Sequence, residues 1–499
     1  CGGAISSLVN NSPSPETRTH LAGAPDWCWA LGLFLLSVLY FGATQPVAPA
    51  EAAGGEGQAL HAMARAIPRH LPPSAATPYV FRIGLPMLVA VVAKSADWVV
   101  GAGFDRVNLV FNLASVWLLL TLLRDVVPSV AVRTGLIAAF IVEPHSSIRL
   151  SAFHPVSTDA AAMAFVLAGL VGIRWFEARP MVFRALALAG LVCLGVAIHE
   201  VVLVVAIGLL FANPASGASW TERWRGLSRS GAWIPLCTGV LTVLALRAWI
   251  VPAPQSLSFW QVAMEALSHQ SAMRVVLSWF LVAGVPVLLI GVLWGRYGAA
   301  IRLRPAFAVL AMLCAAAAVV SDAEGERIVA LAFPIVLSVA GQMLAMTAVP
   351  AILPVAALAL HALSSRFVVP IGGPVETPEV LGQAWERLLA PGVTWALSST
   401  NMWAQRCDSV MLGVYGAWFV VCAGVLLFVP RLSTTGAAGT HRIPPRPGTI
   451  VQSSVVRTAA FAVVTIAAIM PIAWISGGAV YERTFASPGL VSVAYNGAR

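Results

Sequence analysis

The residues of this chain that could perform chemistry are ionisable side chains placed beside or within long apolar runs. A charge held in an apolar membrane segment is costly unless it is paired or hydrated, so each such residue needs a structural or a functional reason. We take as site candidates Glu56, Arg82, Asp159, His199, Glu200, Asp322, Glu326 and Arg327.

Glu56 stands at the start of the stretch GEGQALHAMARAIPRH. The helical spacing of Leu60, Met63, Ala64 and Ile67 in this stretch predicts a short amphipathic helix at a membrane interface, ended by the prolines at 72–73. A carboxylate near a bilayer surface could act as a general base on a hydroxyl group. The alternative is an ordinary acidic residue in the first turn of a helix, where the helix dipole favours it.

The two arginines each have two interpretations. Arg82 precedes an apolar run that contains Pro86, and it could bind a phosphate or extend toward the interface. Arg327 lies in the segment SDAEGERIVALAFPIVL together with Asp322 and Glu326. This segment could be a solvated turn, or it could place Arg327 at the head of a helix that Pro334 kinks, in reach of an anionic head group.

The remaining candidates lie at two expected helix ends. Thr158 is predicted to cap a helix, with Asp159 in its first turn; a substrate or metal contact is the alternative. The apolar run 183–212 is too long for one straight crossing, and the pair His199–Glu200 lies in its middle. We therefore expect two short helices that meet at this pair.

The elements that must position these residues are membrane helices. Of the 499 residues, 59% are hydrophobic and only 10% are charged, whereas about 25% is usual for soluble domains. The net charge of +9 comes from arginines that are scattered between apolar runs, which argues against a nucleic-acid partner. The predicted fold class is an all-α, polytopic transmembrane helical bundle with about 11–13 hydrophobic segments.

The expected organisation has four parts. These are a disordered tail at 1–26, a bundle at 27–363 with an outer loop at 45–82, a second outer loop at 364–409, and spanning segments at 410–499 around a cytoplasmic loop at 430–456. Basic clusters near 174–184, 223–229, 296–304 and 431–446 are assigned to the cytoplasm. Three apolar segments between 83 and 143 then give one crossing too many, so one of them should re-enter, and 131–143 is the shortest.

Several chemistries have no support in the sequence. It contains no Walker A, HExxH or GxSxG motif, and its seven cysteines show neither a CxxC pair nor a metal-ligand spacing. The chain begins with Cys-Gly-Gly and without Met, which favours a truncated start over a lipidated cysteine.

The order of these features resembles the glycosyltransferase C superfamily of bacterial membrane enzymes. The similarity covers about residues 27–340 and rests on Glu56 in the first outer loop, on Tyr79, Arg82 and Pro86, on Thr158–Asp159, on His199–Glu200, and on SDAEGERIVALAFP. The family's loop acid is usually Asp, and His199 stands where a basic residue is usual.

The resemblance implies a multi-pass enzyme of the bacterial plasma (inner) membrane. It would transfer a hexose or pentose from a polyprenyl-phosphate donor to a glycan or other cell-envelope acceptor on the outer side. Glu56 would be the base and Arg82 and Arg327 would hold the phosphate. The family often carries a divalent metal near the loop acid, but the sequence fixes no ligand set for one.

Two other classes of protein remain open. A secondary transporter would use His199, Glu200 or Asp159 as an intramembrane site, although the chain lacks a second broken helix in a matching half. A non-catalytic membrane assembly protein would tolerate substitution of the polar outer residues.

Overall fold

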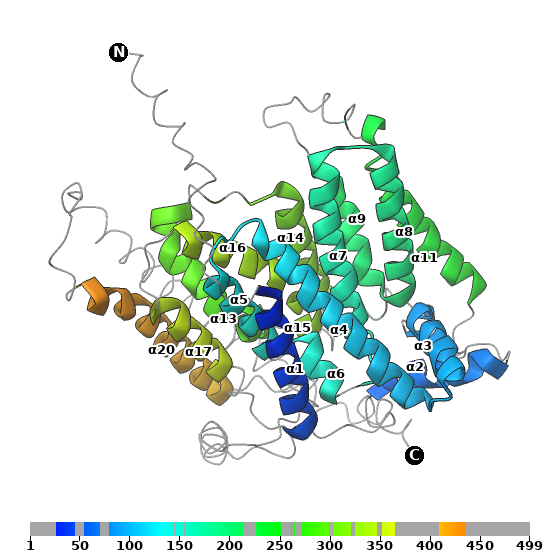
Figure 1. The fold of residues 1–499 in the computed structure, drawn as a ribbon, viewed down its shortest axis with the longest axis horizontal. Coiled ribbons are helices and arrows are strands. Elements are labelled where there is room, and N and C mark those ends of the chain that lie inside the picture. Colours follow the sequence, from blue (N-terminus) through cyan, green and yellow to red (C-terminus); the bar gives the residue numbers. More distant parts are fainter. Residues whose placement is uncertain are drawn as a thin grey trace.

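In the computed structural model, the regular secondary structure of the described residues is entirely helical (Figure 1). The structure describes residues 26–44, 54–69, 79–143, 145–153, 155–212, 228–250, 272–298, 303–320, 325–346, 352–364 and 409–434, with 226, 261, 264 and 301. The expected tail at 1–26, the loop at 364–409 and the segments after 434 lie almost wholly outside the described residues, as does Asp322.

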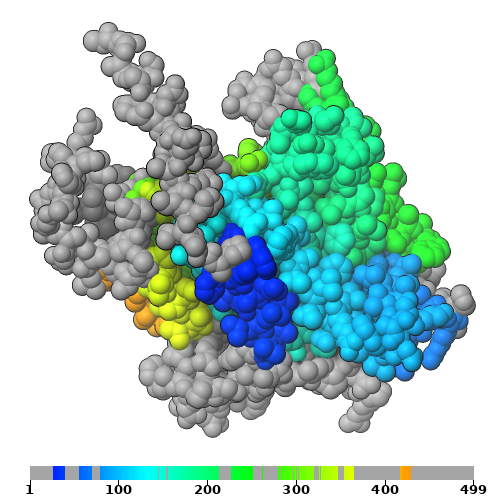
Figure 2. All heavy atoms as spheres, in the orientation of Figure 1, coloured from blue at the N-terminus to red at the C-terminus, as the bar shows by residue number. Residues whose placement is uncertain are grey.

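Helices α1 (Asp26–Thr44), α4 (Val100–Arg124) and α5 (Val130–Val142) pack against one another and are joined by charges at one end. Asp26 accepts hydrogen bonds from Arg124 at 2.6 Å and from Arg133 at 2.9 Å. Arg133 also donates to the carbonyl groups of the turn between α4 and α5. Figure 2 shows α1 on the molecular surface beside α4.

The long apolar run at 183–212 is broken at His199–Glu200, as the sequence predicts. Helix α8 (Val182–Ile198) ends there, a 3₁₀ turn (η4, Glu200–Val202) follows, and α9 (Leu203–Leu209) begins. Helices α7 (Asp159–Ala178) and α11 (Ile234–Trp249) pack on α8.

Helices α4 and α7 run side by side in the same direction, which defines two ends of the bundle. Asn108 of α4 donates to the carbonyl of Ser157, just before α7 begins, and Arg174 near the end of α7 donates to the carbonyl of Leu122. We call these the Glu56 end and the Arg174 end.

The short helix α3 (Gly84–Ala96) stays at the Glu56 end. Gly84 lies against Ala197 at the end of α8, and Val89 and Ala93 contact Gly103 in the first turn of α4. The segment that does not run the length of the bundle is therefore α3, whereas α5 returns from the Arg174 end. Which segment between 83 and 143 re-enters a membrane stays a prediction, because α3 and α5 both have 13 residues.

The amphipathic helix predicted in the first loop is present as α2 (Gly54–Ala66), followed by the 3₁₀ turn η2 (Ile67–Arg69). Leu60, Met63 and Ala64 are fully buried, in a cluster shared with α3 and α4. The helix ends before the prolines at 72–73 that were expected to end it.

The second half of the chain supplies α13 (Ala272–Tyr297), α14 (Pro305–Val320), α15 (Gly325–Ala330), α16 (Phe333–Met346), α17 (Ile352–Ser364) and α20 (Ser409–Thr434). The expectation that Pro334 kinks a helix is wrong. The chain turns between α15 and α16, and Pro334 lies in the first turn of α16, where a missing N–H costs nothing.

Among the described residues, α4 and α7 are long and apolar enough to cross a membrane. That property follows from length and composition alone, and a buried core helix of a soluble protein can share it. Eleven shorter apolar helical stretches accompany them.

Candidate functional site: a buried chain of alternating charges

Five charged side chains from five separate segments meet at the Glu56 end of the bundle. In spatial order they are Glu200, Arg82, Glu56, Arg327 and Asp159. Each neighbour in this order has the opposite charge, so the group, which we call the charge chain, carries a formal net charge of −1.

Glu56 lies at the centre of the charge chain. Its Oε1 accepts hydrogen bonds from Arg82 Nη1 at 2.9 Å and from the Thr158 hydroxyl at 2.7 Å. Its Oε2 accepts one from Arg327 Nη2 at 2.7 Å. Glu56 is 6% exposed, so its charge is neutralised by arginines in place of water.

Each arginine also holds a second carboxylate through two hydrogen bonds. Arg82 binds Glu200 at 3.1 and 2.9 Å, and Arg327 binds Asp159 at 2.8 and 2.6 Å. Such paired bonds fix the orientation of a guanidinium plane. Arg82 is the more enclosed of the two, at 2% exposed, whereas Glu200 is half-exposed.

Opposing effects set the ionisation of Glu56. Burial alone raises the pKa of its carboxyl group, but the charges of Arg327 and Arg82 and the hydrogen bond from Thr158 outweigh burial and hold the pKa well below its usual value of 4.5. Glu56 is thus ionised at neutral pH and, in this arrangement, a weak base.

Local structure explains how distant segments reach one place. Glu56 is in the first turn of α2, and the 3₁₀ turn η3 (Tyr79–Phe81) precedes Arg82 and α3. A Cβ on Gly84 would lie 3.0 Å from the backbone of Ala197, so the absence of a side chain lets α3 approach α8 closely. This approach brings Arg82 to Glu200.

The expectation that the side chain of Thr158 caps α7 is wrong. Thr158 occupies the N-cap position of α7, but its side chain makes no capping hydrogen bond and its hydroxyl donates to Glu56. The buried carboxylate is the stronger acceptor. Asp159 does lie in the first turn of α7, as predicted.

The candidate role of His199 in substrate binding stays a prediction, and the structure shows a local hydrogen bond of its ring. Its Nδ1 accepts a hydrogen bond from the backbone N–H of Val201 and so caps η4. The same nitrogen lies 3.7 Å from Glu200. Glu326 belongs to α15, but its side chain is not among those that the structure describes.

A divalent metal does not fit the charge chain. Among the described residues, no three His, Cys, Asp or Glu side chains gather as ligands. The carboxylates of Glu56 and Asp159 face the Arg327 guanidinium that lies between them. A cation would need to displace that arginine.

Sequence reasoning missed a buried polar track that leads away from Thr158 along α4. Asn108 and Asn112 donate to the 147–157 segment, which includes α6 (Ser147–Phe153). The Oδ1 atoms of both asparagines and the hydroxyl of Ser157 are buried without a described partner. Two asparagines four residues apart within an apolar run were the signal that could have revealed it.

The fold and site together define an all-helical protein with an ion-paired centre at one end of its bundle. Comparisons with protein-family models and with curated proteins found no match to this chain.

Proposed function

We propose that this chain is a multi-pass membrane glycosyltransferase that moves a sugar from a polyprenyl-phosphate donor to a cell-envelope acceptor on the outer side of the bacterial inner membrane. The observation that carries the proposal is Glu56 shared between Arg82 and Arg327, at 2.9 and 2.7 Å. A candidate base and two candidate phosphate ligands, far apart in sequence, thereby meet in one site.

Exposed apolar side chains support the membrane part of the proposal. Large apolar residues are more than 60% exposed on helices throughout the described chain. They include Leu36, Leu39, Val91, Val110, Phe183, Leu194, Leu241, Met312, Val355 and Phe428. Exposure of so much apolar surface to water is unfavourable, whereas lipid accommodates it.

In the proposed mechanism, the donor's phosphate draws Arg327 and Arg82 toward itself. Glu56 then loses the two charges that lower its pKa while its burial persists, so the pKa rises and the carboxylate becomes an effective base. The acceptor hydroxyl transfers its proton to Glu56, and its oxygen forms a bond to the anomeric carbon. The bond from that carbon to the phosphate oxygen breaks, and the lipid phosphate leaves with the electron pair, stabilised by the arginines.

The test compares binding and sugar transfer in purified variants. Arg327→Gln should weaken saturable polyprenyl-phosphate binding by about tenfold or more, because a charge-assisted contact is lost. Glu56→Gln should keep binding but lose transfer by about 10²–10⁴-fold. In Glu56→Gln each arginine still has its other carboxylate, so the charges stay balanced.

Arg65→Gln is the matched control, since Arg65 is exposed on the same helix as Glu56. This variant should change neither polyprenyl-phosphate binding nor sugar transfer. The proposal fails if folded wild-type protein shows no saturable binding of polyprenyl-phosphate. It also fails if Glu56→Gln retains full sugar transfer with a donor that the wild type uses.

A secondary transporter is the second candidate, and the polar track beside α4 favours it. Buried polar atoms without protein partners usually hold ordered water, which a proton or substrate pathway requires. Proteoliposomes distinguish the two functions. An imposed pH gradient that drives solute uptake, lost in Asn108→Leu, would favour the transporter, and sugar transfer without a gradient would favour the enzyme.

A further inference from the structure

A second polar site lies at the Arg174 end of the bundle, remote from the charge chain. Asp159 begins α7 and Arg174 stands fifteen residues later, about 22 Å along the helix at 1.5 Å per residue. A cavity there has a volume of about 30 Å³ and is lined by residues of α4, α7, α14 and α16.

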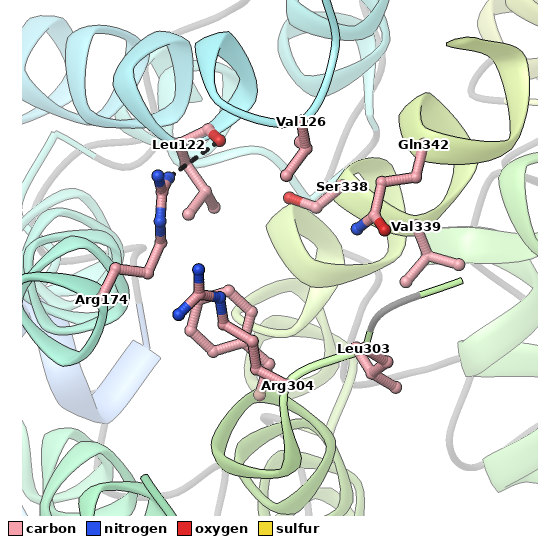
Figure 3. A pocket seen from close by; sticks show the side chains of 9 residues that line it. Leu122, Val126, Arg174, Leu303, Arg304, Ser338, Val339 and Gln342 are labelled. Carbon is pink, nitrogen blue, oxygen red and sulfur yellow. Dashed lines mark hydrogen bonds between the residues drawn. The ribbon is translucent and has the colours of Figure 1, made fainter. Parts of the chain in front are cut away.

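Two guanidinium groups line this cavity, and an Nη atom of Arg174 also donates to the carbonyl of Leu122 (Figure 3). Figure 3 shows Arg174 and Arg304 side by side within it, with Ser338 and Gln342 of α16 on the facing wall. The Nε of Arg174 is buried and has no hydrogen-bond partner among the described residues. A buried, unpaired donor on a cation, close to a second cation, is a costly arrangement that a bound anion would relieve.

The carboxylates nearby do not fill this role. Arg174 pairs with Asp125 through an Nη atom, and that carboxylate is 54% exposed. Arg304 pairs with Glu177, again through an Nη atom. Neither pair satisfies the Arg174 Nε.

The size and lining of the cavity indicate the class of anion. A water needs about 10–15 Å³ of such volume, so the cavity admits more than one oxygen of a phosphoryl group. Two arginines match the charge and the several acceptor oxygens of a phosphate. Leu303, Phe307 and Val339 make the remaining wall apolar, which suits a carbon chain attached to the phosphate.

We infer that Arg174 and Arg304 form a phosphate-binding site at the end of the bundle opposite the charge chain. The phosphate belongs either to a phospholipid head group or to a free phosphate ion. The same end carries Arg124, Arg133 and Arg184, so the charge around the site favours anions. The inference rests on this geometry and does not depend on the proposed transferase activity.

The experiment measures binding to the purified full chain by native mass spectrometry, after delipidation in a phosphate-free neutral detergent. The probes are phosphatidic acid, diacylglycerol with the same acyl chains, and inorganic phosphate as a competitor. The wild type should bind phosphatidic acid saturably and diacylglycerol at least about tenfold more weakly, because only the former offers an anion. Competition by inorganic phosphate would assign the site to the free ion, and its absence would assign the site to the lipid.

Two variants and a control keep the result specific. Arg174→Gln should weaken phosphatidic acid binding by about tenfold. Arg304→Gln combined with Glu177→Gln should do the same, and this double variant leaves no unpaired carboxylate to disturb folding. Arg179→Gln, an exposed arginine at the end of α7, should have no effect.

The inference is overturned if folded wild type shows no saturable binding, if phosphatidic acid and diacylglycerol bind equally, or if Arg179→Gln weakens binding as much as Arg174→Gln. Failure here leaves polyprenyl-phosphate binding through Arg327 untouched, so the two proposals can fail separately.

Discussion

The two ends of the bundle use the same residue types in opposite ways. At the Glu56 end, three carboxylates and two arginines form one connected chain around the nearly inaccessible Glu56 and Arg82. At the Arg174 end, the pairs are separate, several partners are half-exposed, and a cavity remains between the cations. Because the charge chain is connected and buried, the removal of one member disturbs its neighbours. At the Arg174 end, an exposed carboxylate such as Asp125 can be hydrated by water when its arginine is removed.

The largest expected effect is that of removing Arg82. Arg82→Gln leaves Glu200 without its arginine and Glu56 with one cation in place of two, which should lower the free energy of unfolding by about 3–5 kcal/mol. Arg124→Gln, at a side chain that is 38% exposed, leaves Asp26 paired with Arg133 and should cost about 1 kcal/mol or less. Thermal unfolding of the two variants in the same detergent compares the ends directly, and equal losses would contradict the contrast.

An intermediate effect is expected from pH. Because the folded-state pKa of Glu56 is lowered, its stabilisation is fully present above the unfolded value near 4.5 and is lost as pH falls toward the folded value. The melting temperature of the wild type should therefore exceed that of Glu56→Gln at about pH 7, and the difference should shrink as pH falls below about 4.5. A difference that stays constant with pH would show that Glu56 is not held ionised by the arginines.

The smallest expected effect is the difference in stability between two glycine-to-alanine variants. Gly84→Ala would place a Cβ 3.0 Å from the backbone of Ala197, which cannot move aside, and should destabilise the protein by about 1–3 kcal/mol. Gly172→Ala, toward the Arg174 end, would meet only the flexible end of Leu188 and should cost less. If Gly172→Ala destabilises the protein more than Gly84→Ala does, the close approach of α3 to α8 does not position Arg82.

Much of the site could be predicted because charges in apolar runs are costly. Glu56, Arg82, Asp159, Glu200 and Arg327 were each selected on that ground, and the structure brings all five together. Their pairing could not be predicted, since it depends on how α2, α3, α7 and α15 approach one another. For the same reason the hydroxyl of Thr158 bonds to Glu56 and does not cap its own helix.

Helix positions followed the apolar runs, and the break at His199–Glu200 was predicted correctly. The turn between α15 and α16 was missed, because residues 331–332 are apolar and give no local signal before Pro334. That α3 remains at one end was missed as well. Only the tertiary contacts of Gly84 and Gly103 reveal it.

The ion pairs of Asp26 have a consequence for the order in which the protein is assembled. Helix α1 exposes Leu35, Leu36 and Leu39, and buries Ala30 and Phe34. The arginines that hold its first residue are synthesised 98 and 107 residues later. Both ion pairs at the start of α1 are therefore complete only after the turn between α4 and α5 has been synthesised.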